Sequence, residues 1–266
     1  MENKWIKEFS DSLYEAEKSR TPVKPLTSTK TDLSLEEAYQ IQNFNAQRAM
    51  KQGRKLIGYK VGLTSKVVQQ KFGVDEPDFG HLFHDMLLLN DTEVDLSQLI
   101  QPKIEGEVAF VMGKDLSTSG VTPTEVIRAV DYVTCSFEIV DSRIENWKIK
   151  GADTIADNGS SSRFVLSPKK TLLSDLDFSH VGMALSKNGV VEVTGSASAV
   201  MGNPIHAVAF VANELGRFGK TIHAGDVILS GSLSGMLEMK DSDFFSCEMW
   251  RLGTVNVTCR NKGESK

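Results

Sequence analysis

Residues 102–110, Pro-Lys-Ile-Glu-Gly-Glu-Val-Ala-Phe, place two carboxylates two positions apart in a run that otherwise has the composition of a β-strand. Successive side chains of a strand point to opposite faces, so Glu105 and Glu107 share one face while the apolar residues line the core face. Two glutamates on one face repel each other unless water or a cation screens them. The stretch therefore indicates a strand whose charged pair a bound divalent metal would neutralise.

A third glutamate, Glu138, interrupts another apolar, strand-like run at residues 135–140. Glutamate is almost never fully buried unless it is paired. Together with Glu105 and Glu107 it makes a set of three carboxylates, without His or Cys nearby in sequence, that suits Mg²⁺ or Mn²⁺ better than a structural Zn²⁺. The alternative is that Glu105 and Glu107 line the solvent face of an edge strand while Glu138 pairs with an arginine. Both interpretations stay open, because the sequence does not show that the two strands are neighbours.

The composition excludes several classes of protein. The 266 residues carry a net charge of −5 without any block of Lys or Arg, so no nucleic-acid partner is expected. No stretch approaches the ~20 apolar residues of a membrane span, and the N-terminus has no apolar signal segment. We therefore expect a cytoplasmic protein that does not bind a membrane. Three scattered cysteines are expected to be buried thiols in a reducing compartment.

The first part of the chain is predicted to be helical. Apolar residues at helical spacing predict a helix over residues 3–18, and residues 21–30 then break the pattern as a connector. A second helix is expected to begin at a capping box formed by Ser34 and Glu37 and to stop at Gly53. Residues 1–55 are thus expected to form a small helical element.

The remainder, residues 56–266, is predicted to be one β-rich catalytic domain. Further elements are strands at residues 56–65, 227–229 and 253–258, a hairpin turning at Asn188-Gly189, and helices over 123–131 and from Asn203-Pro204 to Gly216 or Gly219. Regular βα alternation and a Gly-x-Gly-x-x-Gly fingerprint are both missing from the sequence. These patterns favour an α+β fold over a doubly wound one.

Two polar stretches are expected to be loops. Residues 73–80 are rich in turn formers, and their acidic residues, Asp78 among them, would by default be exposed. Residues 141–163 form a longer polar stretch, and loops of that length are usually functional or disordered. Lys60 lies inside the expected strand at residues 56–65, with a glycine two places to either side that lets backbone or ligand approach its ammonium closely. A solvated lysine is the alternative.

Six motifs in the same order identify a family resemblance. They are Gly58–Ser65 (GYKVGLTS), Glu76–Gly80 (EPDFG), Pro102–Glu107 (PKIEGE), Glu138–Arg143 (EIVDSR), Ala156–Ser161 (ADNGSS) and Gly202–Pro204 (GNP). From about residue 30 to 260 the chain resembles the 2-hydroxypenta-2,4-dienoate (2-keto-4-pentenoate) hydratase family, within the fumarylacetoacetate hydrolase superfamily. The resemblance implies a mixed β-roll or barrel preceded by N-terminal helices. The chain departs from the family pattern at Gly106, where relatives often carry a larger residue such as Ala.

The resemblance assigns the three glutamates a role. Glu105, Glu107 and Glu138 correspond to residues that hold a divalent metal in the family, which we expect to be Mg²⁺ or Mn²⁺. Three glutamates and a divalent cation leave one net negative charge, and a chelating 2-oxo acid makes the cluster more negative. Lys60 is the candidate for the compensating cation.

The remaining expected roles concern the substrate. Backbone amides and hydroxyls around Asn158, Ser160 and Ser161 are candidate donors to the substrate carboxylate. Asp78 is expected to position or deprotonate the attacking water, and Lys60 to assist proton transfer at the enol.

The implied activity is addition of water to 2-hydroxypenta-2,4-dienoate, through its 2-oxo-enoate tautomer, to give 4-hydroxy-2-oxopentanoate in meta-cleavage catabolism of aromatic compounds. The closest rival activity is that of a 4-oxalocrotonate decarboxylase, in which an apolar residue tends to stand at the position of Asp78. A homo-oligomer is expected from the family, and association with a pathway partner enzyme is a further option.

Hydrolysis of a carbon-carbon bond and a purely structural role both fit the sequence less well. Cleavage of an acylpyruvate normally needs a histidine with an acidic partner, and none of His81, His84, His206 and His223 sits beside a metal glutamate in sequence. A non-catalytic partner subunit would not need to retain the three glutamates and Lys60.

Overall fold

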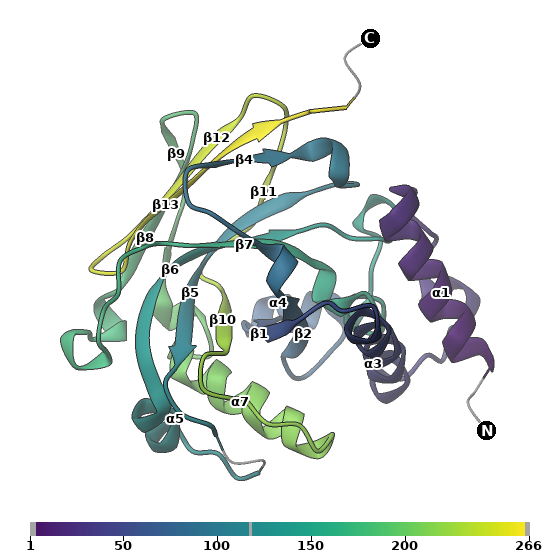
Figure 1. Ribbon diagram of the computed structural model, residues 1–266, viewed down its shortest axis with the longest axis horizontal. Coiled ribbons are helices and arrows are strands. Elements are labelled where there is room, and N and C mark those ends of the chain that lie inside the picture. Colours follow the sequence, from purple (N-terminus) through teal and green to yellow (C-terminus); the bar gives the residue numbers. More distant parts are fainter. Residues whose placement is uncertain (1–3, 117–118, 264–266) are drawn as a thin grey trace.

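Two β-sheets form the framework of the protein, whose computed structural model describes residues 4–116 and 119–263 (Figure 1). The larger sheet contains β1 (Leu56–Gly62), β2 (Asp78–Phe83), β3 (Leu87–Leu88), β5 (Lys103–Met112), β6 (Val130–Val140), β7 (Ser161–Leu166), β10 (Val227–Ser232) and β11 (Leu237–Glu238). Its order is β2-β1-β10-β5-β6-β7-β3, and β11 pairs with β5. Strands β5 and β6 are therefore central, which rules out an edge strand for the two glutamates of β5.

The smaller sheet is formed mainly by the C-terminal part of the chain. It contains β4 (Thr92–Asp95), β8 (Gly182–Lys187), β9 (Val190–Ser196), β12 (Phe244–Met249) and β13 (Gly253–Arg260), in the order β4-β13-β12-β8-β9. The predicted hairpin is confirmed: β8 and β9 are joined by Asn188 (φ 52°) and Gly189 (φ 82°), the two positive φ angles that a type I′ turn requires.

The helices are α1 (Lys4–Ser19), α2 (Leu26–Thr29), α3 (Leu35–Lys51), α4 (Lys66–Phe72), α5 (Pro123–Ala129), α6 (Gly151–Ala156) and α7 (Pro204–Arg217). The long predicted helices are confirmed, while α2 is a short turn inside the expected connector. The capping box is present, because Ser34 accepts from the Glu37 amide and Glu37 accepts from the Ser34 amide. None of the helices in the described ranges is long and apolar enough to cross a membrane.

Helices α1 and α3 lie side by side at one end of the molecule (Figure 1). The Asn45 side chain of α3 donates to the Ser10 carbonyl of α1 at 3.0 Å. Gln42, also on α3, donates to the carbonyls of Phe79 on β2 and Ile155 on α6, both at 2.8 Å. The helical segment thus fixes two parts of the β-rich region, and the proposed domain boundary at residue 55 stays a prediction.

The hydrophobic core lies between the two sheets. Cys135 on β6 and Cys247 on β12 are free, buried thiols, as predicted, and their sulfur atoms are 3.9 Å apart. Gly106 on β5 faces the same layer: a Cβ there would lie 2.8 Å from the Cys247 sulfur, and it would also overlap the Met183 sulfur. Close packing of the sheets therefore accounts for a glycine at position 106.

Two expectations about loops were wrong. Asp78 begins β2 and is only 2% exposed, so the segment that looked like a solvated turn enters the sheet. The stretch 141–163 contains α6 and the start of β7 and is largely buried. Its polar residues are buried because they bond one another: Arg143 Nε donates to Asp157 Oδ1 at 2.5 Å.

Candidate metal centre and active-site cavity

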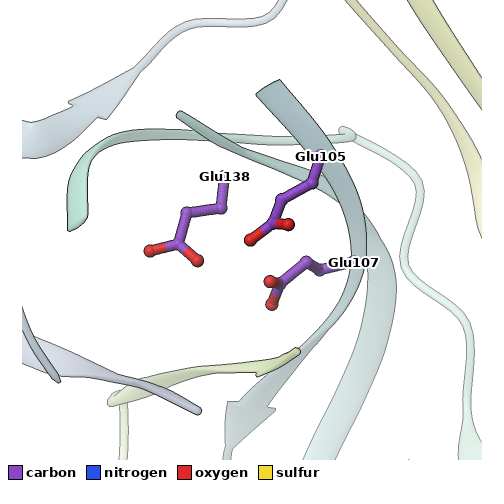
Figure 2. A group of neighbouring side chains, drawn as sticks. All are labelled: Glu105, Glu107 and Glu138. Atoms are coloured by element: carbon purple, nitrogen blue, oxygen red, sulfur yellow. The ribbon is translucent and has the colours of Figure 1, made fainter. Parts of the chain in front are cut away.

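The three predicted metal ligands converge on one point (Figure 2). Strands β5 and β6 pair antiparallel, with Glu105 directly opposite Glu138. Glu107 follows two residues later on the same face. Each residue offers a carboxylate oxygen, and these atoms lie within 4.8 Å of one another. Glu107 and Glu138 are fully buried and Glu105 is partly exposed.

Several carboxylate oxygens in this cluster lack a hydrogen-bond partner in the part of the chain that the structure describes. One oxygen of Glu107 accepts from the Gly231 amide at 2.7 Å, but its second oxygen and both oxygens of Glu138 are unpartnered. Lys60 Nζ lies 3.6 Å from Glu138, an ion pair too long for a hydrogen bond. The cationic neighbour of Glu138 is thus a lysine rather than an arginine. Buried, unpartnered carboxylate oxygens suit a hard divalent cation.

Electrostatics in the cluster favour binding of a positive charge. Burial, with the negative charge of Glu138, raises the pKa of Glu105 to about 7. Burial and the neighbouring Glu138 and Glu105 charges raise the pKa of Glu107 well above its ordinary value. Burial alone would lower the pKa of Lys60, but the negative charges of Glu138, Asp78, Glu105 and Glu107 outweigh it and raise that pKa. Protons and a metal cation therefore compete for the same carboxylates.

Lys60 and Asp78 lie next to each other across β1 and β2. Their antiparallel pairing places Lys60 opposite Gly80 and Gly62 opposite Asp78. A Cβ at Gly62 would lie 3.0 Å from Lys60 Nζ and would overlap a carboxylate oxygen of Asp78. Only glycine leaves room for both groups here, which gives a physical reason for the Lys-Val-Gly sequence.

Asp78 retains one free acceptor. Its carboxylate lies beside Gly62, and Oδ1 has no hydrogen-bond partner among the described residues. Burial raises the pKa of Asp78 above its ordinary value, and Lys60 opposes that rise. The residue lines the cavity described below, so Oδ1 can accept a hydrogen bond from a water or a substrate hydroxyl.

A left-handed turn covers the Lys60 side chain. Asn158, Gly159 and Ser160 have φ angles of 57°, 57° and 56°, which is rare for consecutive residues. A Cβ at Gly159 would lie 2.5 Å from Lys60 Cε. Glycine is therefore required both for the backbone conformation and for the close approach to the lysine.

Of the three predicted substrate donors, Ser160 lines the same cavity as Lys60. The Asn158 side chain bonds the backbone of His81, accepting from its amide at 2.7 Å and donating to its carbonyl at 3.0 Å. Ser161 lines a separate pocket of about 280 Å³ beside α1 and α3. The structure thus brings Ser160 to the cavity of Lys60. The Asn158 side chain instead holds the backbone of β2, and the Ser161 side chain faces the other pocket. Their contacts with substrate stay predictions.

Sequence reasoning missed two supports of the site. Asp157 accepts from Arg143 and, at 3.1 Å, from the Ser160 hydroxyl, so this buried ion pair holds the left-handed turn. Gly231, at the end of β10, reaches the glutamates, because its amide donates to Glu107 at 2.7 Å. The neighbouring Ser232 pairs with Glu107 across β10 and β5. Arg143 and Asp157 each lie in one of the six motifs, and this is the sequence feature that could have pointed to their ion pair.

A cavity of about 560 Å³ opens beside these groups, a size typical of small-molecule sites. Lys60, Asp78, Glu105 and Ser160 line its charged part. The histidines that a carbon-carbon hydrolase would need do not line it. His81 is buried, with Nε2 3.2 Å from Lys220 Nζ, and His84, His206 and His223 are exposed.

Comparisons with known proteins agree with this geometry. The chain is 47% identical over 250 residues to a 2-keto-4-pentenoate hydratase of Paraburkholderia xenovorans, covering 94% of this chain and 93% of the relative. It is 40% identical to the TodF product hydratase of Pseudomonas putida F1, covering 95% and 94%.

Among solved structures, the 4-oxalocrotonate decarboxylase of Pseudomonas putida G7, complexed with magnesium and adipate, superposes with a TM-score of 0.94 at 31% identity, covering 97% of this chain and 98% of that chain. Residues 55–260 match the model of the fumarylacetoacetate (FAA) hydrolase C-terminal domain. The convergent glutamates therefore lie on the fold that the motifs implied, and the chain belongs to the fumarylacetoacetate hydrolase family.

Proposed function

We propose that the protein is a metal-dependent hydratase that adds water to 2-hydroxypenta-2,4-dienoate, through its 2-oxo-enoate tautomer, to give 4-hydroxy-2-oxopentanoate in meta-cleavage catabolism of aromatic compounds. The observation that carries the proposal is the convergence of three carboxylates, of which Glu105 lines the same cavity as Lys60 and Asp78. The relative at 47% identity is itself named a 2-keto-4-pentenoate hydratase.

Glu105, Glu107 and Glu138 would hold the metal, which we propose to be Mg²⁺ or Mn²⁺. Their unpartnered oxygens fit such an ion, and the similar decarboxylase was solved with magnesium. When bound, the cation supplies Lewis-acid stabilisation of the negative charge that develops on the substrate's 2-oxo group.

Lys60 would balance the charge of the substrate and move a proton at the enol. Its ammonium is buried, lies 3.6 Å from Glu138 and is covered by the turn at Gly159, so its position is fixed before substrate binds. A preorganised cation in a cavity closed on one side interacts more strongly with an anion than a solvated one does. Ser160, with the backbone around Asn158 and Ser161, would donate to the substrate carboxylate.

Asp78 would hold or deprotonate the water that adds to the conjugated system. Its free Oδ1 supplies the acceptor, and burial keeps its pKa above the ordinary value, closer to that of an effective general base. Lys60 is close enough to take part in the same proton transfers.

A decarboxylase is the second candidate, because the superposition on 4-oxalocrotonate decarboxylase extends over 97% of the chain. Asp78 and the higher identity to hydratases favour hydration. From the family resemblance alone, we further propose a cytoplasmic homo-oligomer, with association of a pathway partner enzyme as an option.

The test offers 2-hydroxypenta-2,4-dienoate and 4-oxalocrotonate separately, with Mg²⁺ or Mn²⁺, and follows dienol absorbance and CO₂ release. We expect loss of the dienol to dominate, to stop after chelation, and to return when metal is restored. Full activity in metal-free protein would disprove the metal-dependent mechanism. Faster CO₂ release from 4-oxalocrotonate would instead identify a decarboxylase.

A further inference from the structure

The cavity is larger than the simplest dienoate needs. 2-Hydroxypenta-2,4-dienoate has eight non-hydrogen atoms, and even if each took the ~30 Å³ of a liquid water molecule, it would fill about 240 Å³ of the roughly 560 Å³ present. More than half of the space therefore lies beyond the atoms that react. Addition of a phenyl group to the far end of the substrate would raise the requirement only to about 420 Å³ on the same scale.

Many of the other side chains that line the cavity are apolar. They include Leu63, Val67, Phe72, Trp147, Ile149 and Met236, and Lys71 and Lys103 line the cavity as well. Two of these side chains are unusually exposed for their type, Val67 at 78% and Met236 at 40%. Exposed apolar side chains that line a cavity mark a place where an apolar part of a ligand can bind.

Trp147 is held in this wall by a strained backbone. Its φ angle is 55° and that of the preceding Asn146 is 56°, a conformation that is an outlier for a bulky residue. Such strain persists only where the surroundings impose it, and it is concentrated at ligand sites.

Two interactions fix the Trp147 ring. The indole nitrogen donates to the Gln101 carbonyl at 3.1 Å, and Lys103 Nζ lies 4.7 Å from the ring centroid. Lys103 and Glu105 share one face of β5, with α-carbons about 6.7 Å apart on the usual strand rise. A dienoate whose carboxylate end lies at the glutamate cluster would therefore extend along β5 toward the indole.

We propose that Trp147 is a specificity-determining residue, and that with Val67 and Met236 it selects dienoates that carry an apolar alkyl or aryl substituent at the end remote from the carboxylate. The inference rests on the proposed hydratase function, because it uses the orientation that this reaction requires. The ammonium of Lys103 lies over the indole, so its role is to hold the ring.

The test compares kcat/KM for 2-hydroxypenta-2,4-dienoate, 2-hydroxyhexa-2,4-dienoate and 2-hydroxy-5-phenylpenta-2,4-dienoate. We expect the wild type to prefer the substituted substrates. Trp147→Ala should lower that preference about tenfold or more through KM, with a much smaller change in kcat, since one hydrophobic contact is worth about 10–200-fold. Trp147→Phe should restore most of it.

Trp250→Ala is the matched control, because Trp250 also stacks on a cation, Arg251 at 5.1 Å, but does not line the cavity. Trp250→Ala should leave kcat/KM for all three substrates unchanged. Ligand binding gives an independent test. In the wild type, 2-oxooctanoate should change the tryptophan fluorescence more than 2-oxobutanoate does, and Trp147→Phe should abolish the difference.

The outcomes separate the two proposals. If the wild type hydrates the dienoates but Trp147→Ala changes the preference no more than Trp250→Ala does, the role of Trp147 is refuted while the hydratase stands. A wild-type preference for a substrate with a distal carboxylate, such as 2-hydroxyhexa-2,4-dienedioate, would also refute the proposed selection of apolar substituents. If no dienoate is hydrated, the proposed function itself fails.

Discussion

Replacing Glu107 with Gln tests whether the carboxylate cluster is a metal site or a structural ion-pair network. The substitution removes one charge and keeps the volume. Its amide oxygen can still accept from the Gly231 amide, as Glu107 does at 2.7 Å, and its NH₂ group can donate to a neighbouring carboxylate. In the metal-free protein the variant should therefore be more stable than the wild type.

The magnitude follows from the pKa values in the cluster. The pKa of Glu105 rises from 4.5 to about 7, which corresponds to roughly 3 kcal/mol of destabilisation of the ionised group. Glu105 faces the cavity, so solvent screens part of this. Glu107 is fully buried and its pKa is raised in the same direction. We expect Glu107→Gln to stabilise the metal-free protein by about 1–3 kcal/mol, or several degrees in Tm.

The effect should depend on pH with a definite sign. Because the pKa of Glu107 is higher in the folded than in the unfolded protein, the wild type is not penalised below about pH 4 and loses stability as pH rises through the folded pKa. The difference between variant and wild type should therefore be small near pH 4 and full at alkaline pH.

Thermal melts with chelator and with excess Mg²⁺ provide the assay. Metal should stabilise the wild type by about 2.7 kcal/mol at a hundred times its Kd, and the variant far less. Glu192→Gln, at an exposed position of β9, is the control and should change stability by less than about 0.5 kcal/mol. A Glu107→Gln protein that melts below wild type under chelator at alkaline pH would refute a convergent, repelling cluster.

Two further substitutions probe the groups around the metal site. Asp78→Asn should lower kcat about a hundredfold or more while metal affinity, measured by the Mg²⁺ dependence of Tm, stays near wild type, because the role we propose for Asp78 is to act on water. A loss of metal affinity as large as that of Glu107→Gln would show instead that Asp78 is a ligand. Gly159→Ala should destabilise the protein by about 2 kcal/mol or more in thermal melts, since it adds left-handed strain and a contact with Lys60. Its control, Gly219→Ala, has a similar φ of 66° but open space around it, so an equal loss in both would show that the contact with Lys60 is immaterial.

The sequence by itself determined the local elements and which carboxylates are the candidate metal ligands. The capping box at Ser34, the turn at Asn188-Gly189 and the long helices depend on residues close in the chain, whose interactions are formed within one or two turns. Glu105 and Glu107 were identified as a pair because a strand places residues two apart on one face. The six motifs then supplied the family, the third glutamate's role and the expected fold.

The tertiary structure decided what depends on contacts between distant segments. Asp78 was expected to be exposed and the stretch 141–163 to be a loop because both are polar. Yet Asp78 enters the sheet, and Arg143 and Asp157, fourteen residues apart, stabilise each other inside the protein. Burial of a polar group is favourable only when its partner is supplied, and partners from distant segments do not show in a local pattern. The pairing of Glu105 with Glu138, like the closure of Gly159 over Lys60, therefore had to come from the folded chain.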